Sequence, residues 1–110
     1  MYIAMNRFKV LKDAAKDFEN VWFTRESYLH ELPGFVEFHL LKGPVADDHT
    51  LYSSHTTWID KAAFEAWTRS DEFRRAHARA DNKTGESLYL GHPKFEGFEV
   101  IQSERKAAAA

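Results

Sequence analysis

The sequence contains no cysteine among its 110 residues. This absence excludes disulfide bonds, a thiolate nucleophile and any metal site with cysteine ligands. The chain also lacks an apolar run of the length that spans a membrane. Its first residues, MYIAMNRFKV, have neither the charged start nor the apolar centre of a signal peptide. We therefore expect a cytoplasmic protein with no membrane partner.

Charge of one sign is not concentrated anywhere in the chain. Fifteen Lys and Arg residues stand against 17 Asp and Glu residues, which gives a formal net charge of -2 with neutral His. A nucleic-acid-binding surface needs clustered positive charge, even where aromatic side chains stack on bases. We therefore expect no nucleic acid partner. The dinucleotide motif GxGxxG is absent too, so any redox reaction needs electrons from an external donor.

The length of the chain is typical of one domain. We assign residues 1–103 to a single domain and residues 104–110 to a tail. The tail ends in the run Ala107–Ala110, which is either frayed native sequence or non-native sequence. We give this tail no functional role.

Periodicity predicts four strands and a long first helix. The strands alternate apolar and polar residues or are rich in Thr and aromatic residues, over Tyr2–Val10, Phe35–Leu41, Leu51–Ile59 and Phe95–Gln102. The first helix is predicted over about Ala14–Glu31, with Asp13 as its N-cap and Pro33-Gly34 as its stop signal.

The second helical region is predicted in two pieces. Asp60 is positioned to cap a short helix over about Lys61–Trp67. Ser70 offers a second cap, followed by a piece with Phe73, Ala76, His77 and Ala80 along one face. We also expect a turn formed by Gly43-Pro44 and the polar Asp47-Asp48, and a loop over Asp81–His92.

The resulting order, β-α-β-β-α-β, predicts an α+β fold of the ferredoxin-like type, with one antiparallel sheet and both helices on one face. Both faces of the strands carry apolar residues, but the helices cover only one. A small domain often gains a larger core by dimerising. We therefore expect a homodimer in which two sheets form a dimeric α+β barrel.

Three residues in this frame are candidates for a site. Trp67 and His77 lie ten positions apart, which on one continuous helix is about 1000° of turn and leaves them about 80° out of alignment. A break at Ser70 re-aims the second piece, so both side chains can face one cavity. Asn6 shares a strand face with Ala4 and Phe8, where an amide must find a hydrogen-bond partner.

Each candidate has a plain structural alternative. A Trp at helical spacing from Phe64 is usually part of a core. His77 lies among apolar residues, and Asn6 can simply bond to nearby backbone. The other five histidines, His30, His39, His49, His55 and His92, form no metal-binding motif.

The stretches IAMNRFKV, PGFVEFHLLKGP, LYSSHTTW and FEAWTRSDEFRRAHA resemble those of IsdG-type haem-degrading monooxygenases. These enzymes lie within the antibiotic-biosynthesis-monooxygenase-like group, and the chain is similar to its proteobacterial branch called HmuQ. The resemblance covers about Tyr2 to Ile101. Family members carry an Asn on the first strand, a Trp on the second helical region and a His after the break. Asn6, Trp67 and His77 match in identity and order.

The resemblance implies a role for each of the three. His77 would be the proximal ligand of the haem iron, and imidazole is a suitable axial ligand. Asn6 would lie on the distal side and donate a hydrogen bond to oxygen bound at the iron. Trp67 would press on the porphyrin and hold it out of plane, since a rigid indole is a suitable wedge. Haem would be both cofactor and substrate, with O2 and an external reductase or reductant as co-reactants.

Further residues are candidates for the same site. The candidate pocket walls on the same faces are Phe8, Val21, Phe23, Phe64 and Phe73, all of which also read as ordinary core. The candidate contacts for the haem propionates are Arg74, Arg75 and Arg79, although charges on a helix usually form a solvated face.

The resemblance implies that the porphyrin ring is opened, with release of iron and a bilin-type product. Two other functions remain open. One is a cofactor-free monooxygenase of the antibiotic-biosynthesis or quinol type, which would use the same pocket residues without iron. The other is a non-catalytic haem carrier or a dimeric ligand-binding module, because a fold alone does not define a function.

Overall fold

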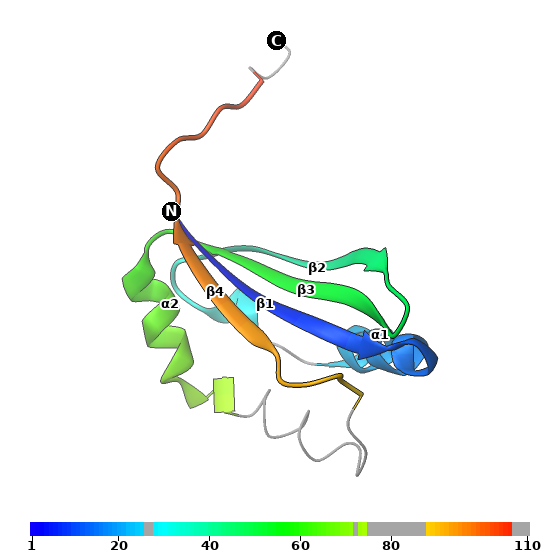
Figure 1. Cartoon of the computed structure of the whole chain (residues 1–110). Helices are drawn as coiled ribbons and strands as arrows, with labels where there is room; N and C mark the ends of the chain where they lie inside the picture. Colours follow the sequence, from blue (N-terminus) through cyan, green and yellow to red (C-terminus); the bar gives the residue numbers. More distant parts are fainter. Residues whose placement is uncertain (26–27, 72, 75–87, 107–110) are drawn as a thin grey trace.

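The computed structural model describes residues 1–25, 28–71, 73–74 and 88–106. Within them, one antiparallel sheet has the strand order β2-β3-β1-β4. The elements are β1 Tyr2–Leu11, η1 Lys12–Ala14, α1 Ala15–Thr24, η2 Leu29–Glu31, β2 Phe35–Val45, β3 His49–Trp58, α2 Lys61–Thr68 and β4 Lys94–Glu99. Both α1 and α2 lie on the same side of the sheet (Figure 1). The predicted ferredoxin-like arrangement is confirmed.

The central strand β1 determines which side chains face the helices. It pairs with β3 on one side and β4 on the other. Every second residue is buried on the helix side, as in Tyr2, Ala4, Phe8 and Val10, which are at most 7% exposed. The alternation follows from the period of two in an extended strand. It confirms the faces expected from the sequence.

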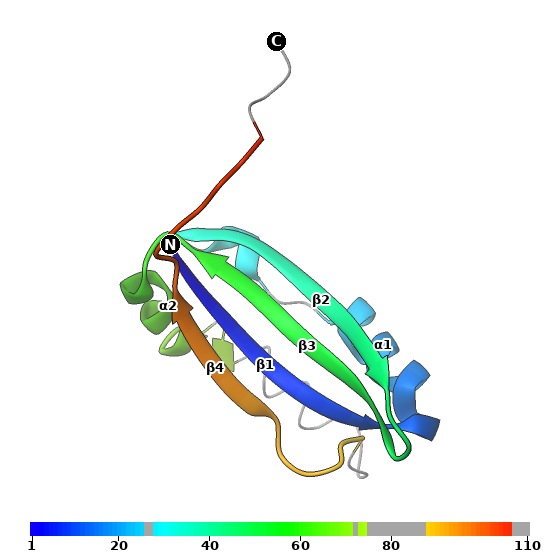
Figure 2. The ribbon, with the colours of Figure 1, turned by 45° about the horizontal axis from the view of Figure 1, so that its top comes forward.

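The core on this side consists of two separate clusters. The first contains Tyr2, Ala4, Leu29 and Trp58, with α2 residues packed against it. The second contains Phe8, Val10, Phe18 and Tyr52, with α1 residues packed against it. Figure 2 shows the two helices under opposite ends of the sheet. The middle of this face, where Asn6 lies, is therefore the boundary between the clusters.

The α2 region has the two caps expected from the sequence. The Asp60 carboxylate accepts a hydrogen bond from the backbone N–H of Ala63 at 2.8 Å. The Ser70 hydroxyl accepts one from the backbone N–H of Phe73 at 3.1 Å. A new helical turn therefore begins at Ser70, as predicted. No helix in the described part of the chain is long and apolar enough to cross a membrane.

The first helix is shorter than expected, and the prediction of one helix over Ala14–Glu31 is wrong. It ends at Thr24, Arg25 is extended, and Tyr28 has a left-handed backbone with φ of 60°. The physical reason is that the apolar residues of the predicted helix serve both clusters. Phe18 packs into the second cluster, whereas Leu29 is buried in the first. The chain must leave the helix to pass from one to the other.

Two further expectations need correction. Gly43 and Pro44 form no turn; they lie inside β2, where the pairing is irregular between Lys42 and Val45. An edge strand tolerates proline, because one side of its backbone has no pairing partner. The turn lies at Asp47-Asp48, the other half of the prediction, where the Ala46 N–H donates to the His49 carbonyl at 2.8 Å.

Part of the expected loop over Asp81–His92 also pairs with the sheet. The Leu11 N–H donates to the Leu88 carbonyl at 3.0 Å, and the Leu90 N–H donates to the Lys9 carbonyl at 2.7 Å. Tyr89 forms a bridge with Val10 between these bonds. Residues 81–87 lie outside the described residues. The last strand ends at Glu99 rather than Gln102.

A hydrogen bond between two side chains connects α1 to the sheet at the second cluster. The Tyr52 phenol, only 1% exposed, donates a hydrogen bond to the Glu19 carboxylate on α1. Lys42 on β2 lies 3.4 Å from the same carboxylate. Burial, followed by the bond to Glu19, raises the pKa of Tyr52 to about 12. The hydrogen bond from Tyr52 lowers the pKa of Glu19.

We expect Tyr52→Phe to lower the melting temperature by about 5 °C, because it removes one hydrogen bond to a charged group. The neutral phenol is the form that the fold stabilises. Its contribution is therefore complete below pH 10 and is lost as the pH rises from 10 towards 12. Thermal unfolding followed by circular dichroism across this range measures both effects. An equal alkaline loss of stability in Tyr52→Phe contradicts this assignment.

Candidate functional site

Asn6 lies at the centre of the helix-facing side of the sheet. It is half-buried, and it is paired with Ser54 of β3 and Phe95 of β4. In the described part of the chain its side-chain amide makes no hydrogen bond, while the neighbouring Thr56 hydroxyl donates to the Ala4 carbonyl at 3.3 Å. The amide is therefore available to a ligand.

Trp67 is held in an aromatic wall on the α2 side of Asn6. Its ring stacks on Trp58 with centroids 5.4 Å apart and lies 6.0 Å from Phe64. Beyond the break at Ser70, the ring of Phe73 meets Trp67 edge-on at 4.8 Å. Phe73, which follows the break, therefore packs against Trp67.

The other predicted wall residues are divided between the two clusters. Phe8 is buried in the second cluster, and Val21 on α1 is half-buried. Phe64 stacks on Phe95 at 5.6 Å beside the first cluster. Phe23 is 73% exposed, so the described structure does not bring it into either cluster.

Of the basic residues expected near the ligand, Arg74 is exposed and pairs with Asp71 at 3.3 Å. This pair belongs to a surface helical turn, where such pairs contribute little. His77, Arg75 and Arg79 lie outside the described residues. Their roles stay predictions.

The sequence analysis did not single out Arg25 as a site residue, although it lies among apolar residues of the predicted first helix and directly follows α1. Its guanidinium lies over the Trp22 ring at 4.6 Å from the centroid. Its Nε atom is buried and has no hydrogen-bond partner in the part of the chain described. Burial lowers the pKa of Arg25, and the nearby Tyr89 opposes this effect. The signal available in the sequence was a positively charged residue among the apolar residues of the predicted first helix.

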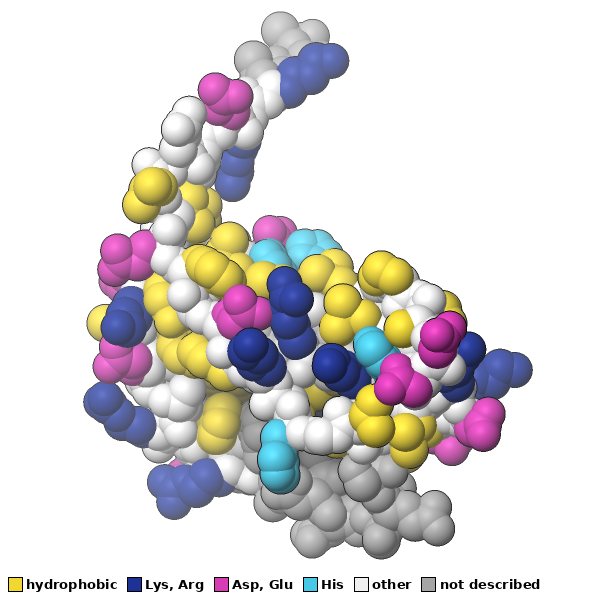
Figure 3. All heavy atoms as spheres, viewed as in Figure 1, with side chains coloured by type: hydrophobic (Ala, Val, Ile, Leu, Met, Phe, Trp, Pro, Cys, Tyr) yellow, Lys and Arg dark blue, Asp and Glu magenta, His cyan; other side chains and the backbone are white. Residues whose placement is uncertain are grey.

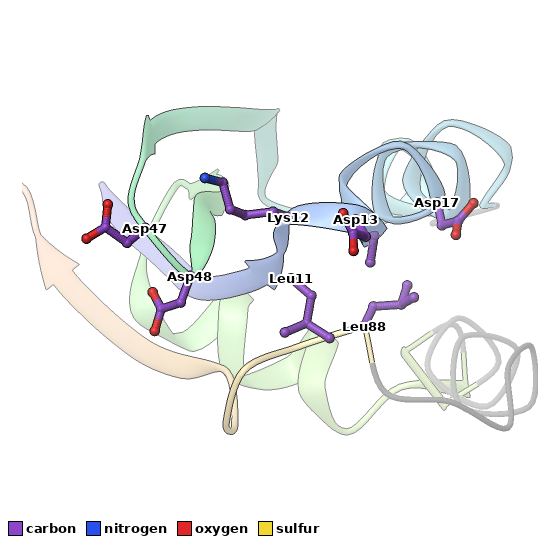
Figure 4. A pocket seen from close by; sticks show the side chains of 8 residues that line it. Leu11, Lys12, Asp13, Asp17, Asp47, Asp48 and Leu88 are labelled. Atoms are coloured by element: carbon purple, nitrogen blue, oxygen red, sulfur yellow. The ribbon is translucent and has the colours of Figure 1, made fainter.

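A second hollow lies at the far end of β1. Its volume is about 540 Å³, and it is lined by Leu11, Lys12, Asp13, Ala14, Asp17, Asp47, Asp48 and Leu88 (Figure 4). Within the described ranges, no group of three or more His, Cys, Asp or Glu side chains is arranged to hold a metal ion. None of the predicted site residues that the structure describes lines this hollow, and we assign it no role.

The chain belongs to the antibiotic biosynthesis monooxygenase family, whose model matches residues 1–79. It is therefore a member of a family of monooxygenases. It is 34% identical over 89 residues to a staphylobilin-producing heme oxygenase of Staphylococcus haemolyticus, covering 79% of this chain and 83% of that protein.

Solved structures of two kinds are similar to the chain. One is the heme-degrader MhuD from Mycobacterium tuberculosis with two hemes bound in its active site. It has a TM-score of 0.69 and 25% identity, and the match covers 94% of this chain and 98% of that one. The other is SnoaB, a cofactor-independent oxygenase from Streptomyces nogalater, with a TM-score of 0.64 and 25% identity over 93% and 94% of the two chains.

The site therefore combines an aromatic wall, a free amide and a half-buried cation on one face of the sheet. The apolar walls suit a flat hydrophobic ligand, and the few polar groups can orient it. The amide can donate to a developing negative charge without supplying a proton. These properties fit both kinds of chemistry among the relatives.

We expect Asn6→Ala to change the free energy of unfolding by at most about 0.5 kcal/mol, because the amide has no partner to lose. Trp67→Ala, by contrast, leaves a cavity beside Trp58 and should cost about 3 kcal/mol. Urea unfolding of both variants measures the difference. A large loss of stability in Asn6→Ala shows instead that the amide has a structural role.

Proposed function

We propose that the chain is a haem-degrading monooxygenase. It binds haem on the helix-facing side of the sheet, opens the porphyrin ring with O2 and external electrons, and releases iron and a bilin-type product. The observation that carries the proposal is the free amide of Asn6 between two aromatic clusters. The heme oxygenase of Staphylococcus haemolyticus and the heme-bound MhuD support it as relatives.

The described residues fit a porphyrin. Its faces are apolar, and the walls formed by Trp67, Phe64 and Phe8 are aromatic. Packing of flat aromatic surfaces excludes water and favours every polar contact that remains inside. Asn6 offers an amide hydrogen-bond donor on the same face of β1 as Phe8.

Each residue has a distinct role in the proposal. His77 holds the iron through its imidazole, in the position implied by the family resemblance. Trp67 would pack against the porphyrin, and its stack on Trp58 would restrict movement of the indole ring. Asn6 donates its amide N–H to the oxygen atom that reaches this face. Bound haem supplies the oxygen chemistry, and the external donor supplies the electrons.

A second candidate is a cofactor-free oxygenase, which the similarity to SnoaB favours. In that case Asn6 and Trp67 would position an aromatic organic substrate directly, and no iron would be involved. The two functions differ in one simple property, because only the first requires stoichiometric binding of haem.

Hemin titration followed by ascorbate in air separates the candidates. For haem degradation we expect a sharp Soret band at about one equivalent, which then decays to a bilin spectrum while a chelator traps the iron. A stable Soret band under reductant indicates a haem carrier. The absence of a specific band excludes haem as the ligand and favours the cofactor-free oxygenase.

Variants test the individual roles. We expect His77→Ala to lose most of its haem affinity, with exposed His92→Ala as a matched control.

Asn6→Ala should bind haem but turn over on the order of tenfold to a hundredfold more slowly, because it loses one oriented donor. Asn20→Ala, on the exposed surface of α1, is its control. Full turnover in Asn6→Ala contradicts the distal role.

We also propose that the protein works as a homodimer joined through the open face of the sheet. Leu41 and Phe98 point to this face and are 41% and 48% exposed. Figure 3 shows hydrophobic side chains reaching the surface over the strands, among Lys, Arg and His side chains. A second sheet of the same kind would remove these groups from water.

Leu41→Glu should convert the dimer to a monomer, since it places a charge within the proposed interface. Ala62→Glu adds the same charge on the exposed side of α2 and should leave the dimer intact. Light scattering coupled to gel filtration measures the mass of each variant. A monomeric parent chain, or an unchanged mass for Leu41→Glu, contradicts the proposed interface.

A further inference from the structure

We propose that His39 and His55 form a binding site for a divalent transition metal ion of the zinc class, on the open face of the sheet. In the sequence these two histidines belong to no metal-binding motif, but the fold places their rings side by side. The site lies on the face opposite to Asn6 and Trp67. The inference is therefore independent of haem binding.

Strand pairing brings the two histidines together. His39 on β2 is the direct partner of His55 on β3. Directly opposed residues of an antiparallel pair project to the same face, with their Cβ atoms about 5 Å apart. Ser54, the residue before His55, pairs with Asn6 on the helix-facing side. Because side chains alternate along a strand, both imidazoles point to the open face.

The spacing of the rings suits a single metal ion. Their centroids are 5.9 Å apart, and their planes are tilted by 55°. A metal ion lies about 2 Å from a ligating imidazole nitrogen, and so about 3 Å from the centre of that ring. Two imidazoles on one ion therefore lie about 5 to 6 Å apart, measured between centroids. The observed pair already has this spacing, so rotation of the side chains is enough to hold an ion.

Neither ring has a hydrogen-bond partner in the described part of the chain, so no protein group there competes with an ion. The Nδ1 atom of His55 is buried and makes no hydrogen bond. His39 is exposed, and its ring makes none either. By contrast, His49 on the same strand as His55 has the Asp48 carboxylate at 2.7 Å. Neutral imidazole is a preferred ligand of zinc, copper and nickel ions.

The pair supplies two ligands, and zinc usually takes four. The carboxylate in the same row of the open face is Glu96, which lies beyond Met5 as seen from His55. Glu96 is already bound by Arg7, with 2.7 Å between Nε and the carboxylate oxygen. The remaining ligands must therefore come from elsewhere.

A second copy of the chain can provide them. β3 is an inner strand of the sheet, and the row of His55 lies between the rows of Leu41 and Phe98. His55 is therefore close to the centre of the open face, through which the proposed homodimer is joined. In an isologous interface the centre of the patch meets its own copy. Two histidine pairs would then share one ion.

Isothermal titration calorimetry with Zn2+ tests the site on the chain without haem. The variants His39→Gln and His55→Gln keep a polar side chain of similar size. We expect each to weaken zinc binding by at least about tenfold, because each removes one of the two ligands. The controls are His30→Gln and His92→Gln, which change exposed histidines elsewhere and should bind zinc as the parent chain does.

The outcomes decide the site and its completion separately. A parent chain that binds no zinc, or equal zinc affinity in all four variants, overturns the site. The expected ratio is one ion to two chains. A ratio of one ion to one chain overturns the sharing between copies and leaves His39 and His55 as the site. Circular dichroism of each variant verifies that lost binding does not reflect unfolding.

Discussion

The pairing of β1 on both of its edges is the constraint on which the rest of the structure depends. With β3 on one side and β4 on the other, its register has no freedom. A slip of one residue would turn Phe8 and Val10 away from the helices and expose them to the open face. The same constraint directs Asn6 inward, although an amide gains nothing from an apolar core. The sheet therefore presents one amide to the helix side at its centre.

The two helices complete this arrangement by occupying opposite ends of the sheet. Each covers its own aromatic cluster, and the chain leaves α1 early to reach the other cluster. The centre of the face is consequently bordered by Trp67 and Phe64 at one end and by Trp22 and Phe8 at the other. Aromatic walls around a few polar groups are typical of sites that bind small molecules.

The polar groups at this centre explain why one fold can serve two chemistries. A free amide stabilises negative charge on oxygen whether that oxygen belongs to a haem complex or to an organic substrate. The family of monooxygenases includes relatives named for each kind. Within the described residues, Arg25 near this face has a buried Nε atom with no hydrogen-bond partner.

The sequence by itself determined the order of elements, the faces of β1 and the caps at Asp60 and Ser70. These follow from alternation and from side chains that bond to neighbouring backbone, which are local effects. Asn6 and Trp67 were predictable as candidates for the same reason and through the family resemblance. Only the tertiary structure decided where α1 ends and that Gly43-Pro44 lies within a strand. It also decided that the Nε atom of Arg25 is buried without a hydrogen-bond partner among the described residues. The spacing of residues along a helix cannot show whether a charged side chain pairs with a carboxylate, because the partner comes from residues distant in the chain.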